Sequence, residues 1–271
     1  MISFSNINLY GLTLAIAVIA CFYIFQKIIT QKKDSLDLDQ VADLFFYLFL
    51  GAILFGRLFF VFSFWHFFYT QPLEIFKLWH GGIAFYGVFS GGLLGLLFWT
   101  KRFTQKNKLN FKNYLIFLLD SILVVLPLGQ SIGRWGNFFN QELFGSPTSL
   151  PWGIFISPDN RPSIFSSQTH FHPVFLYESI LSFCLFIFLF RIYHRKEVPG
   201  FITSLFLIIH GIIRFSLEFL RLDEQLVFYH LRQYQWLALF ELIFGILLFW
   251  YFHRKNVKLE STNIKINYEK K

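Results

Sequence analysis

Long apolar runs separated by short polar breaks dominate the chain. A bilayer core of roughly 30 Å needs about 20 apolar residues per helix, and runs of that length recur between the polar breaks. The pattern predicts an all-α polytopic membrane protein with seven transmembrane helices and an irregular extracytoplasmic loop after the fourth helix. The helices are expected at Leu9 to Ile29, Val41 to Phe62, Ile83 to Thr100, Tyr114 to Gly133, Val174 to Ile192, Phe201 to Phe219 and Trp236 to Phe252.

Composition supports this prediction and excludes two other classes. Of the 271 residues, 55% are apolar and only 15% are charged, whereas soluble domains carry about 25% charged residues and disordered chains contain fewer apolar residues than this. An ordinary soluble enzyme and a disordered protein are therefore excluded. Cys21 and Cys184 lie inside apolar runs, which argues against a disulfide framework or a Cys-rich metal site.

Charge predicts how the helices are oriented. The formal net charge is +8, and most of the 24 Lys and Arg residues fall in the connections after the odd-numbered helices. By the positive-inside rule, the N-terminus is outside and the C-terminus is cytoplasmic, with residues 253–271 as a basic cytoplasmic tail. We expect this excess charge to serve membrane topology and not nucleic-acid binding. No linker or repeat divides the chain, so residues 1–271 are expected to form one membrane domain.

Polar residues that interrupt the apolar runs gather toward the outer boundary on six of the seven predicted helices. An Arg inside a helix costs at least about 2.5 kcal/mol unless it is paired or near an interface, which makes Arg57 and Arg214 functional candidates. Each residue alone could equally be structural, but their clustering favours a site. The set comprises Tyr10, Arg57, Tyr86, Arg134, Asn137, Asn140, Glu142, His172, Tyr177, Glu178, Arg214, Glu218 and Arg221.

The two arginines Arg134 and Arg214 indicate the chemistry of the ligand. Planar guanidinium groups suit a phosphate, and their predicted depth matches a lipid headgroup in the outer leaflet. An anionic phospholipid is therefore predicted as ligand or substrate. Glu218 follows Arg214 at i+4 and Arg221 at i+7 shares that face, so Glu218 is expected either to hold Arg214 in place or to form a purely structural ion pair.

The Gly- and Pro-rich segment from Arg134 to Pro173 is expected to be an ordered irregular loop that covers the site. Asn137 and Asn140 would share a helix face if one more turn of helix continued past Arg134. As an alternative, the two Asn residues simply form turns.

The segment Gly133 to Gly145, GRWGNFFNQELFG, resembles the signature GRxGNFxNxExxG of the bacterial prolipoprotein diacylglyceryl transferases. Seven helices with the N-terminus outside are also typical of that family. Further matches are Tyr10-Gly11-Leu12, Gly81-Gly82, His172-Pro173, Leu176-Tyr177-Glu178, Arg214-Phe215 and Glu218-Phe219 with Arg221.

The resemblance implies that a diacylglyceryl group passes from phosphatidylglycerol to the lipobox cysteine of a lipoprotein precursor. The products are a thioether and glycerol phosphate. The implied partners are phosphatidylglycerol and the signal-peptide segment of the precursor, and no cofactor or metal is implied. The implied location is the bacterial cytoplasmic (inner) membrane, with the active site toward the outer leaflet.

Residue roles also follow from the resemblance. Arg134 and Arg214 are expected to bind the headgroup and to stabilise the departing phosphate, and Asn137, Glu142 and Glu218 to orient these groups. Tyr10, Asn140, His172, Tyr177 and Arg221 complete the expected substrate-binding set.

Tyr86 departs from the family pattern, because many members have a His here that is a proposed general base. A Tyr with a pKa of about 10 is a poor base at neutral pH unless its pKa is lowered. Tyr86 could serve as base or hydrogen-bond donor, or His80 or His172 could take the role. The thiol could also ionise near the cationic site without a dedicated base, or activity could be lost.

Two other functions compete with this interpretation. A non-catalytic protein of the same fold would bind phosphatidylglycerol and release no glycerol phosphate. A small-solute transporter is disfavoured because its charges would lie near the midplane between inverted repeats, whereas here they gather at one boundary. No metal-ligand spacing, nucleotide loop or haem motif occurs in the sequence.

Overall fold

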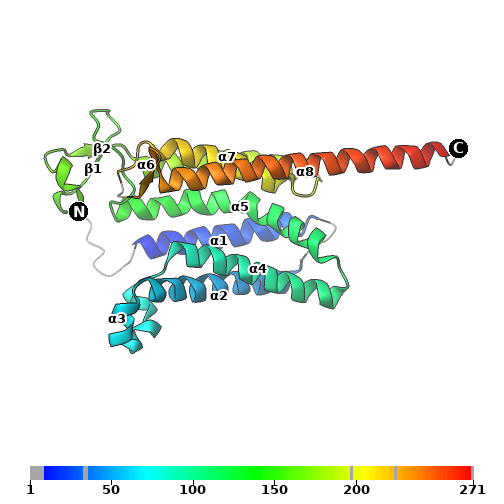
Figure 1. Ribbon diagram of the computed structural model, residues 1–271, viewed down its shortest axis with the longest axis horizontal. Coiled ribbons are helices and arrows are strands. Elements are labelled where there is room, and N and C mark those ends of the chain that lie inside the picture. The colour runs from blue at the N-terminus through cyan, green and yellow to red at the C-terminus, as the bar shows by residue number, and fades with distance from the viewer. Residues whose placement is uncertain (1–8, 33–35, 196–197, 223–224, 270–271) are drawn as a thin grey trace. The chain divides into compact units, whose positions relative to one another are not determined.

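The computed structural model describes residues 9–32, 36–195, 198–222 and 225–269. Within them the chain forms eight α-helices and two short antiparallel hairpins (Figure 1). The chain divides into two compact units, a first unit of Met1–Phe25 with Leu119–Lys271 and a second unit of Gln26–Leu118. The helices are α1 (Leu9–Ile29), α2 (Leu38–Ser63), α3 (Trp65–Thr70), α4 (Phe85–Asn107), α5 (Phe111–Phe139), α6 (Val174–Tyr193), α7 (Phe201–Glu218) and α8 (Gln233–Glu269).

Six of these helices are long and apolar enough to cross a membrane, namely α1, α2, α5, α6, α7 and α8 over Gln233–Arg254. They coincide with six of the seven predicted segments, which confirms a multi-pass membrane protein. The remaining segment is helical as α4, but its glycines and polar C-terminal turns reduce its apolar character. A crossing by α4 and the orientation of the helices stay predictions.

Three predicted helix ends were wrong. We expected α4 to end at Thr100, but it continues to Asn107. We expected α5 to end at Gly133, but it continues to Phe139 and carries part of the polar motif with it. We expected the last helix to end at Phe252, but α8 continues to Glu269. In each case the apolar pattern ends before the helix does, because helix hydrogen bonding continues through polar residues once the turns are formed.

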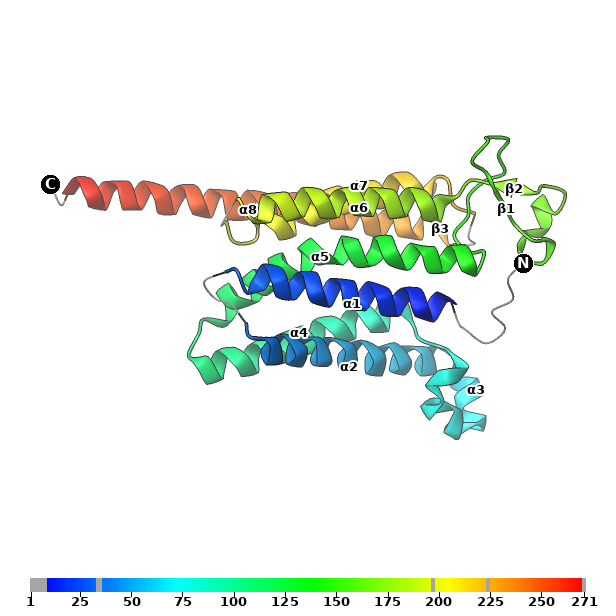
Figure 2. The ribbon, with the colours of Figure 1, turned by 180° about the vertical axis from the view of Figure 1, so that it is seen from behind.

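In the second unit, α2 and α4 lie side by side in both views (Figures 1 and 2). Glycines allow this close approach, because a Cβ atom on Gly91 would lie 2.1 Å from the carbonyl oxygen of Gly51. Gly95 meets the carbonyl of Tyr47 in the same way. Small residues let helix backbones touch where lipid provides no hydrophobic driving force between helices.

Arg57 in α2 holds the segment that connects α2 with α4. Its buried guanidinium donates hydrogen bonds to the backbone carbonyls of Glu74, Ile75, Gly81 and Gly82. These bonds occupy the donors of the guanidinium fork, so they explain how a buried arginine is tolerated there. Sequence analysis treated Arg57 as a functional candidate, whereas its contacts here are those of a structural residue.

The first unit contains the side-by-side helices α5, α6, α7 and α8 together with residues 9–25 of α1 (Figure 2). The strands β1 (Ile154–Phe155) and β2 (His170–Phe171) pair between α5 and α6, and β3 (Val227–Phe228) and β4 (Leu231–Arg232) pair before α8. Gly136 of α5 allows α1 to pack closely against α5, since a Cβ atom at this position would lie 2.7 Å from the ring of Tyr10.

A buried carboxylate on α5 fixes the beginning of α7. Asp120 accepts hydrogen bonds from the backbone amides of Gly200 and Thr203, at 2.7 and 2.8 Å, and from the Thr203 hydroxyl at 2.6 Å. The first amides of a helix lack intrahelical partners and favour a negative charge. Asp120 therefore caps α7 from another helix, and it fixes which face of α7 turns toward α5.

The glycine contact in the second unit generates a stability prediction. We expect Gly91→Ala to lower the free energy of unfolding by about 1–3 kcal/mol, because the new methyl group overlaps the backbone of α2. Gly92→Ala is the matched control, since its Cβ would meet nothing closer than 3.9 Å. That control should be neutral or more stable by about 1 kcal/mol through helix propensity. Denaturation in detergent compares the two, and equal stability would contradict the packing argument.

Candidate active site

A buried carboxylate joins three helices at the centre of the candidate site. Glu178 of α6 is only 2% exposed. Its Oε1 accepts hydrogen bonds from Arg134 Nη2 of α5 at 2.6 Å and from Arg214 Nη1 of α7 at 2.9 Å. An ionised carboxylate is buried only when it is paired, so the two arginines neutralise Glu178 and Glu178 fixes both guanidinium groups.

Glu218 forms a second buried carboxylate at the end of α7. It is 1% exposed, and its Oε1 accepts from Gln225 Nε2 at 2.8 Å and lies 3.3 Å from Arg232 Nη1. Its Oε2 lies 3.9 Å from Arg214 and 3.8 Å from Arg221. Glu218 therefore forms the longer of the two ion pairs of Arg214, and Glu178 is the closer partner of that arginine.

Two guanidinium groups share one carboxylate oxygen in this cluster, because Arg134 and Arg214 both contact Glu178 Oε1. Arg221 and Arg232 contact the second buried carboxylate, Glu218. Within the described residues, the buried Nε of Arg134 has no hydrogen-bond partner. Guanidinium groups that share one carboxylate and keep an unused donor are suited to an anion.

The end of α5 brings Glu142 back to the helix. The amide of Glu142 donates to the carbonyl of Asn137 at 2.8 Å and the amide of Gln141 donates to Phe138 at 3.1 Å, with Gln141 in the left-handed region at φ 52°. This is the Schellman pattern of helix termination. The Glu142 carboxylate then accepts from Asn137 Nδ2 and Asn140 Nδ2, each at 3.2 Å.

The Asn137 side chain links this carboxylate to the arginine cluster, because its Oδ1 accepts from Arg134 Nη1 at 3.4 Å. The alternative in which α5 continues past Arg134 is therefore confirmed, and both Asn residues contact the same carboxylate. Asn137 is buried and Asn140 is exposed. The chain from Arg134 through Asn137 to Glu142 fixes the orientation of the guanidinium from one side, while Glu178 fixes it from the other.

Gly145, the last glycine of the motif, lets the loop cross the end of α7. Its amide donates to the carbonyl of His172 at 2.8 Å, and a Cβ atom would lie 2.6 Å from the carbonyl oxygen of Leu220. Gly145 also forms an isolated bridge with Arg221. The irregular loop predicted from Arg134 to Pro173 therefore begins only after Phe139, where α5 ends, and it contains the short hairpin of β1 and β2.

His172 and Tyr177 are hydrogen-bonded to each other, and Trp152 joins them. The Trp152 indole donates to the Tyr177 hydroxyl at 2.9 Å. That hydroxyl lies 3.1 Å from His172 Nδ1. An indole nitrogen can only donate, so the Tyr177 hydroxyl accepts from Trp152. The same hydroxyl forms a hydrogen bond with His172 Nδ1, so the three side chains hold one another in place.

Tyr86 and His80 belong to the second unit. Tyr86 lies in the first turn of α4 with 44% of its surface exposed. His80 Nδ1 lies 2.7 Å from Glu74 Oε2. Hydrogen bonds from Lys77 and then from His80 hold the pKa of the Glu74 carboxyl below its usual value. Arg57 of α2 also lies in the second unit, and the remaining predicted site residues, from Tyr10 on α1 to Arg221 after α7, lie in the first unit.

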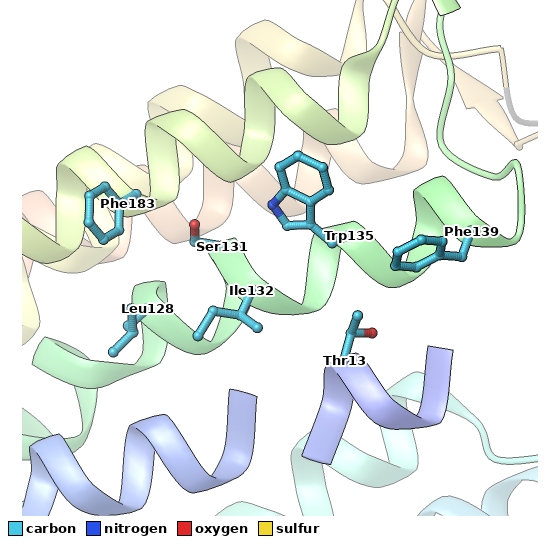
Figure 3. A pocket seen from close by; sticks show the side chains of 7 residues that line it. All are labelled: Thr13, Leu128, Ser131, Ile132, Trp135, Phe139 and Phe183. Carbon is cyan, nitrogen blue, oxygen red and sulfur yellow. The ribbon is translucent and has the colours of Figure 1, made fainter. Parts of the chain in front are cut away.

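An apolar cavity of about 510 Å³ adjoins the arginine-bearing helix. Figure 3 shows that α5 supplies most of its wall, with Thr13 from α1 and Phe183 from α6. Ligand pockets of this kind are mostly apolar and of comparable volume. The residues that line it are Thr13, Leu128, Ser131, Ile132, Trp135, Phe139 and Phe183.

Sequence reasoning named Glu178 as a polar residue but gave it no role, and it missed Arg232 and Gln225. Glu178 precedes its arginine partner Arg214 by 36 positions, so no local spacing could pair them. Arg232 also donates to the carbonyls of Glu218 and Arg221 and thereby closes the end of α7. The sequence did contain one signal for the role of Glu178. A carboxylate at the start of an apolar helix requires a cationic partner.

Comparison with known sequences places these residues in a wider context. The sequence profile described as prolipoprotein diacylglyceryl transferase matches residues 1–251. The phosphatidylglycerol–prolipoprotein diacylglyceryl transferase of Synechococcus elongatus is 38% identical over 249 residues, which cover 89% of this chain and 82% of the relative. The relative of the same name from Gloeobacter violaceus is 36% identical over 93% of this chain and 91% of its own length. The one from Fervidobacterium nodosum is 34% identical over 93% of this chain and 83% of its own length.

The Glu178 cluster generates a second stability prediction. Glu178→Gln should lower the free energy of unfolding by about 3–5 kcal/mol, because it leaves two buried guanidinium groups without their counter-charge. Glu142→Gln is the matched control, since that exposed side chain only accepts from two Asn amides, and it should cost about 1 kcal/mol or less. The measurement is unfolding in detergent with a ligand-free sample. A tolerant Glu178→Gln variant would mean that the cluster is not a structural centre.

Proposed function

The chain belongs to the prolipoprotein diacylglyceryl transferase family, and we propose that it transfers the diacylglyceryl group of phosphatidylglycerol to the lipobox cysteine of prolipoproteins. The reaction forms a thioether and releases glycerol phosphate. The observation that carries the proposal is the buried Arg134–Glu178–Arg214 cluster, in which two guanidinium groups share one carboxylate. The partners are phosphatidylglycerol and the signal-peptide segment of the precursor.

The two arginines Arg134 and Arg214 bind the phosphate of the lipid headgroup. The Glu178 carboxylate holds both guanidinium groups from behind, so they keep further N–H donors for the substrate. Arginine is suited to this double contact because its planar fork presents five donors. The charge that develops on the departing glycerol phosphate meets donors that are already oriented, which is the usual basis of electrostatic catalysis.

The apolar cavity receives an acyl chain of the same lipid. Arg134 and Trp135 are neighbours on α5, and Trp135 lines the cavity while Arg134 joins the ion cluster. One helix thus presents a cationic group and an apolar wall side by side, as an amphipathic phospholipid requires. Ser131 and Ile132 continue the wall one turn away.

The remaining predicted residues position these groups. Asn137, Glu142 and Glu218 orient the arginines through the contacts described above. The other members of the substrate-binding set keep their proposed role at the edge of the site. These are Tyr10, Asn140, His172, Tyr177 and Arg221.

Proton transfer from the thiol needs separate consideration, because Tyr86 stands where many family members have His. Tyr86 remains a candidate as base or hydrogen-bond donor. His172 is another candidate, and its Nδ1 is hydrogen-bonded to the Tyr177 hydroxyl at 3.1 Å. His80 is paired with Glu74. Ionisation of the thiol without a dedicated base stays open at this point.

We further propose that the protein lies in the bacterial cytoplasmic (inner) membrane as a single membrane domain. Seven crossings, including α4, would place the arginine cluster toward the outer leaflet and residues 253–271 in the cytoplasm. The six apolar helices and the charge distribution support this arrangement. Both substrates would then enter sideways from the bilayer.

The proposal predicts that Arg134→Ala lowers kcat/KM about 100-fold or more, because one donor to the developing phosphate charge is lost. The assay mixes purified protein, phosphatidylglycerol and a synthetic lipobox peptide, and follows peptide mass and released glycerol phosphate. Arg191→Ala is the matched control, since Arg191 is exposed near the end of α6. It should retain wild-type activity.

The same assay separates catalysis from binding alone. A wild-type protein that binds phosphatidylglycerol but leaves the peptide unmodified, under conditions where a relative is active, would favour the non-catalytic lipid-binding function. Equal activity of Arg134→Ala and wild type would remove Arg134 from the headgroup site.

The cavity generates a prediction about chain length. Ile132→Trp fills part of the cavity, so it should raise KM for long-chain phosphatidylglycerol about tenfold, equivalent to about 1.4 kcal/mol, with a smaller effect on a short-chain lipid. Ile180→Trp is the control, because Ile180 is exposed on α6 and does not line the cavity. Initial rates over a lipid concentration series measure both. An equal rise for both chain lengths would argue against acyl binding in this cavity.

A further inference from the structure

A second polar cluster lies among α5, α7 and α8 and has no role assigned above. On α7, Nδ1 of His210 lies 2.8 and 3.0 Å from the two carboxylate oxygens of Glu241 on α8. Its Nε2 lies 3.2 Å from Gln130 Nε2 on α5. The ring also stacks on Phe206, with centroids 5.0 Å apart. We call Gln130, His210 and Glu241 the inner cluster.

The inner cluster lies one helical turn from the arginine cluster. Gln130 precedes Arg134 by four residues on α5, and His210 precedes Arg214 by four residues on α7. Residues four apart share a helix face and differ in height by about 6 Å. Arg134 and Arg214 contact the same Glu178 oxygen, so they lie at the same height on α5 and α7. Gln130 and His210 therefore also lie at one height, and the inner cluster is farther from the end of α7 than the arginine cluster is.

Such a cluster inside apolar helices is costly unless it has a function. The side chains of His210 and Glu241 are 15% and 22% exposed, and both lie in helices long enough to cross a membrane. Ionisable residues in such segments commonly mark a proton path or a substrate site. His210 is also positioned by two hydrogen-bonding partners on two other helices, which fixes both the ring and its protonation state.

The partners determine which ring nitrogen is basic. A carboxylate can only accept, so His210 Nδ1 carries the proton that it donates to Glu241. Gln130 Nε2 can only donate, so His210 Nε2 presents its lone pair to that amide. A carboxylate behind Nδ1 and a lone pair on Nε2 is the arrangement in which histidine acts as a general base. A thiol could replace the weak 3.2 Å contact with Gln130.

The geometry of the transfer requires a base on this side of the arginines. In a direct displacement, the attacking sulfur, the glycerol carbon and the departing phosphate oxygen lie in line. The phosphate is held by Arg134 and Arg214, and the glycerol carbon is joined to acyl chains that extend into the bilayer. The sulfur must therefore approach from the side opposite the phosphate, which is the side of the inner cluster.

We propose that His210 is the general base that accepts the proton of the substrate thiol, with Glu241 and Gln130 as positioning residues. This inference rests on the proposed transferase function. The S–H proton passes to His210 Nε2, the sulfur forms a bond to the glycerol carbon, and the carbon–oxygen bond to phosphate breaks. The electron pair of that bond leaves on glycerol phosphate, and His210 later returns its proton to solvent or product.

A selenocysteine peptide separates a base from a merely structural histidine. A selenol ionises at neutral pH without help, whereas a thiol with a pKa of about 8.5 needs a base. With the Cys peptide, we expect His210→Gln to lower kcat about 100-fold or more, the usual range for loss of a general base. With the selenocysteine peptide, the variant should stay within about tenfold of wild type.

Three further variants sharpen the test. Glu241→Gln should show the same selective loss with the Cys peptide to a smaller degree, and it decides the question if His210→Gln does not fold. His194→Gln is the matched control, because His194 is exposed and its side chain contacts only the neighbouring residues Phe190 and Tyr193 among the described residues. It should behave as wild type with both peptides. Tyr86→Phe should show no selective rescue by selenium.

Each outcome decides between the alternatives. Equal losses with both peptides, or no loss at all, would overturn the role of His210 while leaving the transferase function intact. Selective rescue of Tyr86→Phe in place of His210→Gln would assign the base to Tyr86. A wild-type protein that modifies neither peptide would instead overturn the proposed transferase function, and the role of His210 with it.

Discussion

The buried carboxylate of Glu178 is the constraint on which the first unit depends. It lies inside apolar helices, so it must be paired, and both of its partners come from other helices. Pairing with Arg134 fixes α6 against α5, and pairing with Arg214 fixes α6 against α7. The same two contacts leave the guanidinium groups oriented and rich in unused donors. Structural stability and the phosphate recognition that we propose therefore depend on one interaction, and a change to it should affect both.

Buried polar contacts at other heights keep these helices in register. Asp120 caps the beginning of α7, the inner cluster lies near its middle, and Glu178 binds Arg214 one turn beyond. Each contact satisfies a group that would be costly if left alone in lipid. Because all three link α7 to a neighbouring helix, α7 has little freedom to rotate, and its face with His210, Arg214 and Glu218 stays directed into the bundle.

The sequence was sufficient for what depends on local pattern. Apolar runs predicted both ends of α1, and the clustering of Arg134, Asn137, Glu142 and Arg214 predicted residues that the structure brings together. Long-range pairing was not predictable, since nothing local tells Arg214 to choose Glu178 over the nearer Glu218. The extension of α5 past Arg134 was only one of two alternatives, because Gly133 and Gly136 resemble a helix end. In the structure, both glycines face α1 and leave room for it.

Arginine, and not lysine, is required by the geometry at position 134. Its Nη2 binds Glu178, its Nη1 approaches Asn137, and its Nε has no partner among the described residues. A lysine could neutralise Glu178, but its single ammonium group could not also maintain the Asn137 contact and present a separate, fixed donor to a phosphate. An anionic ligand held by Arg134 and Arg214 would add a second counter-charge beside Glu178, so binding should stabilise the same helices that hold the site together.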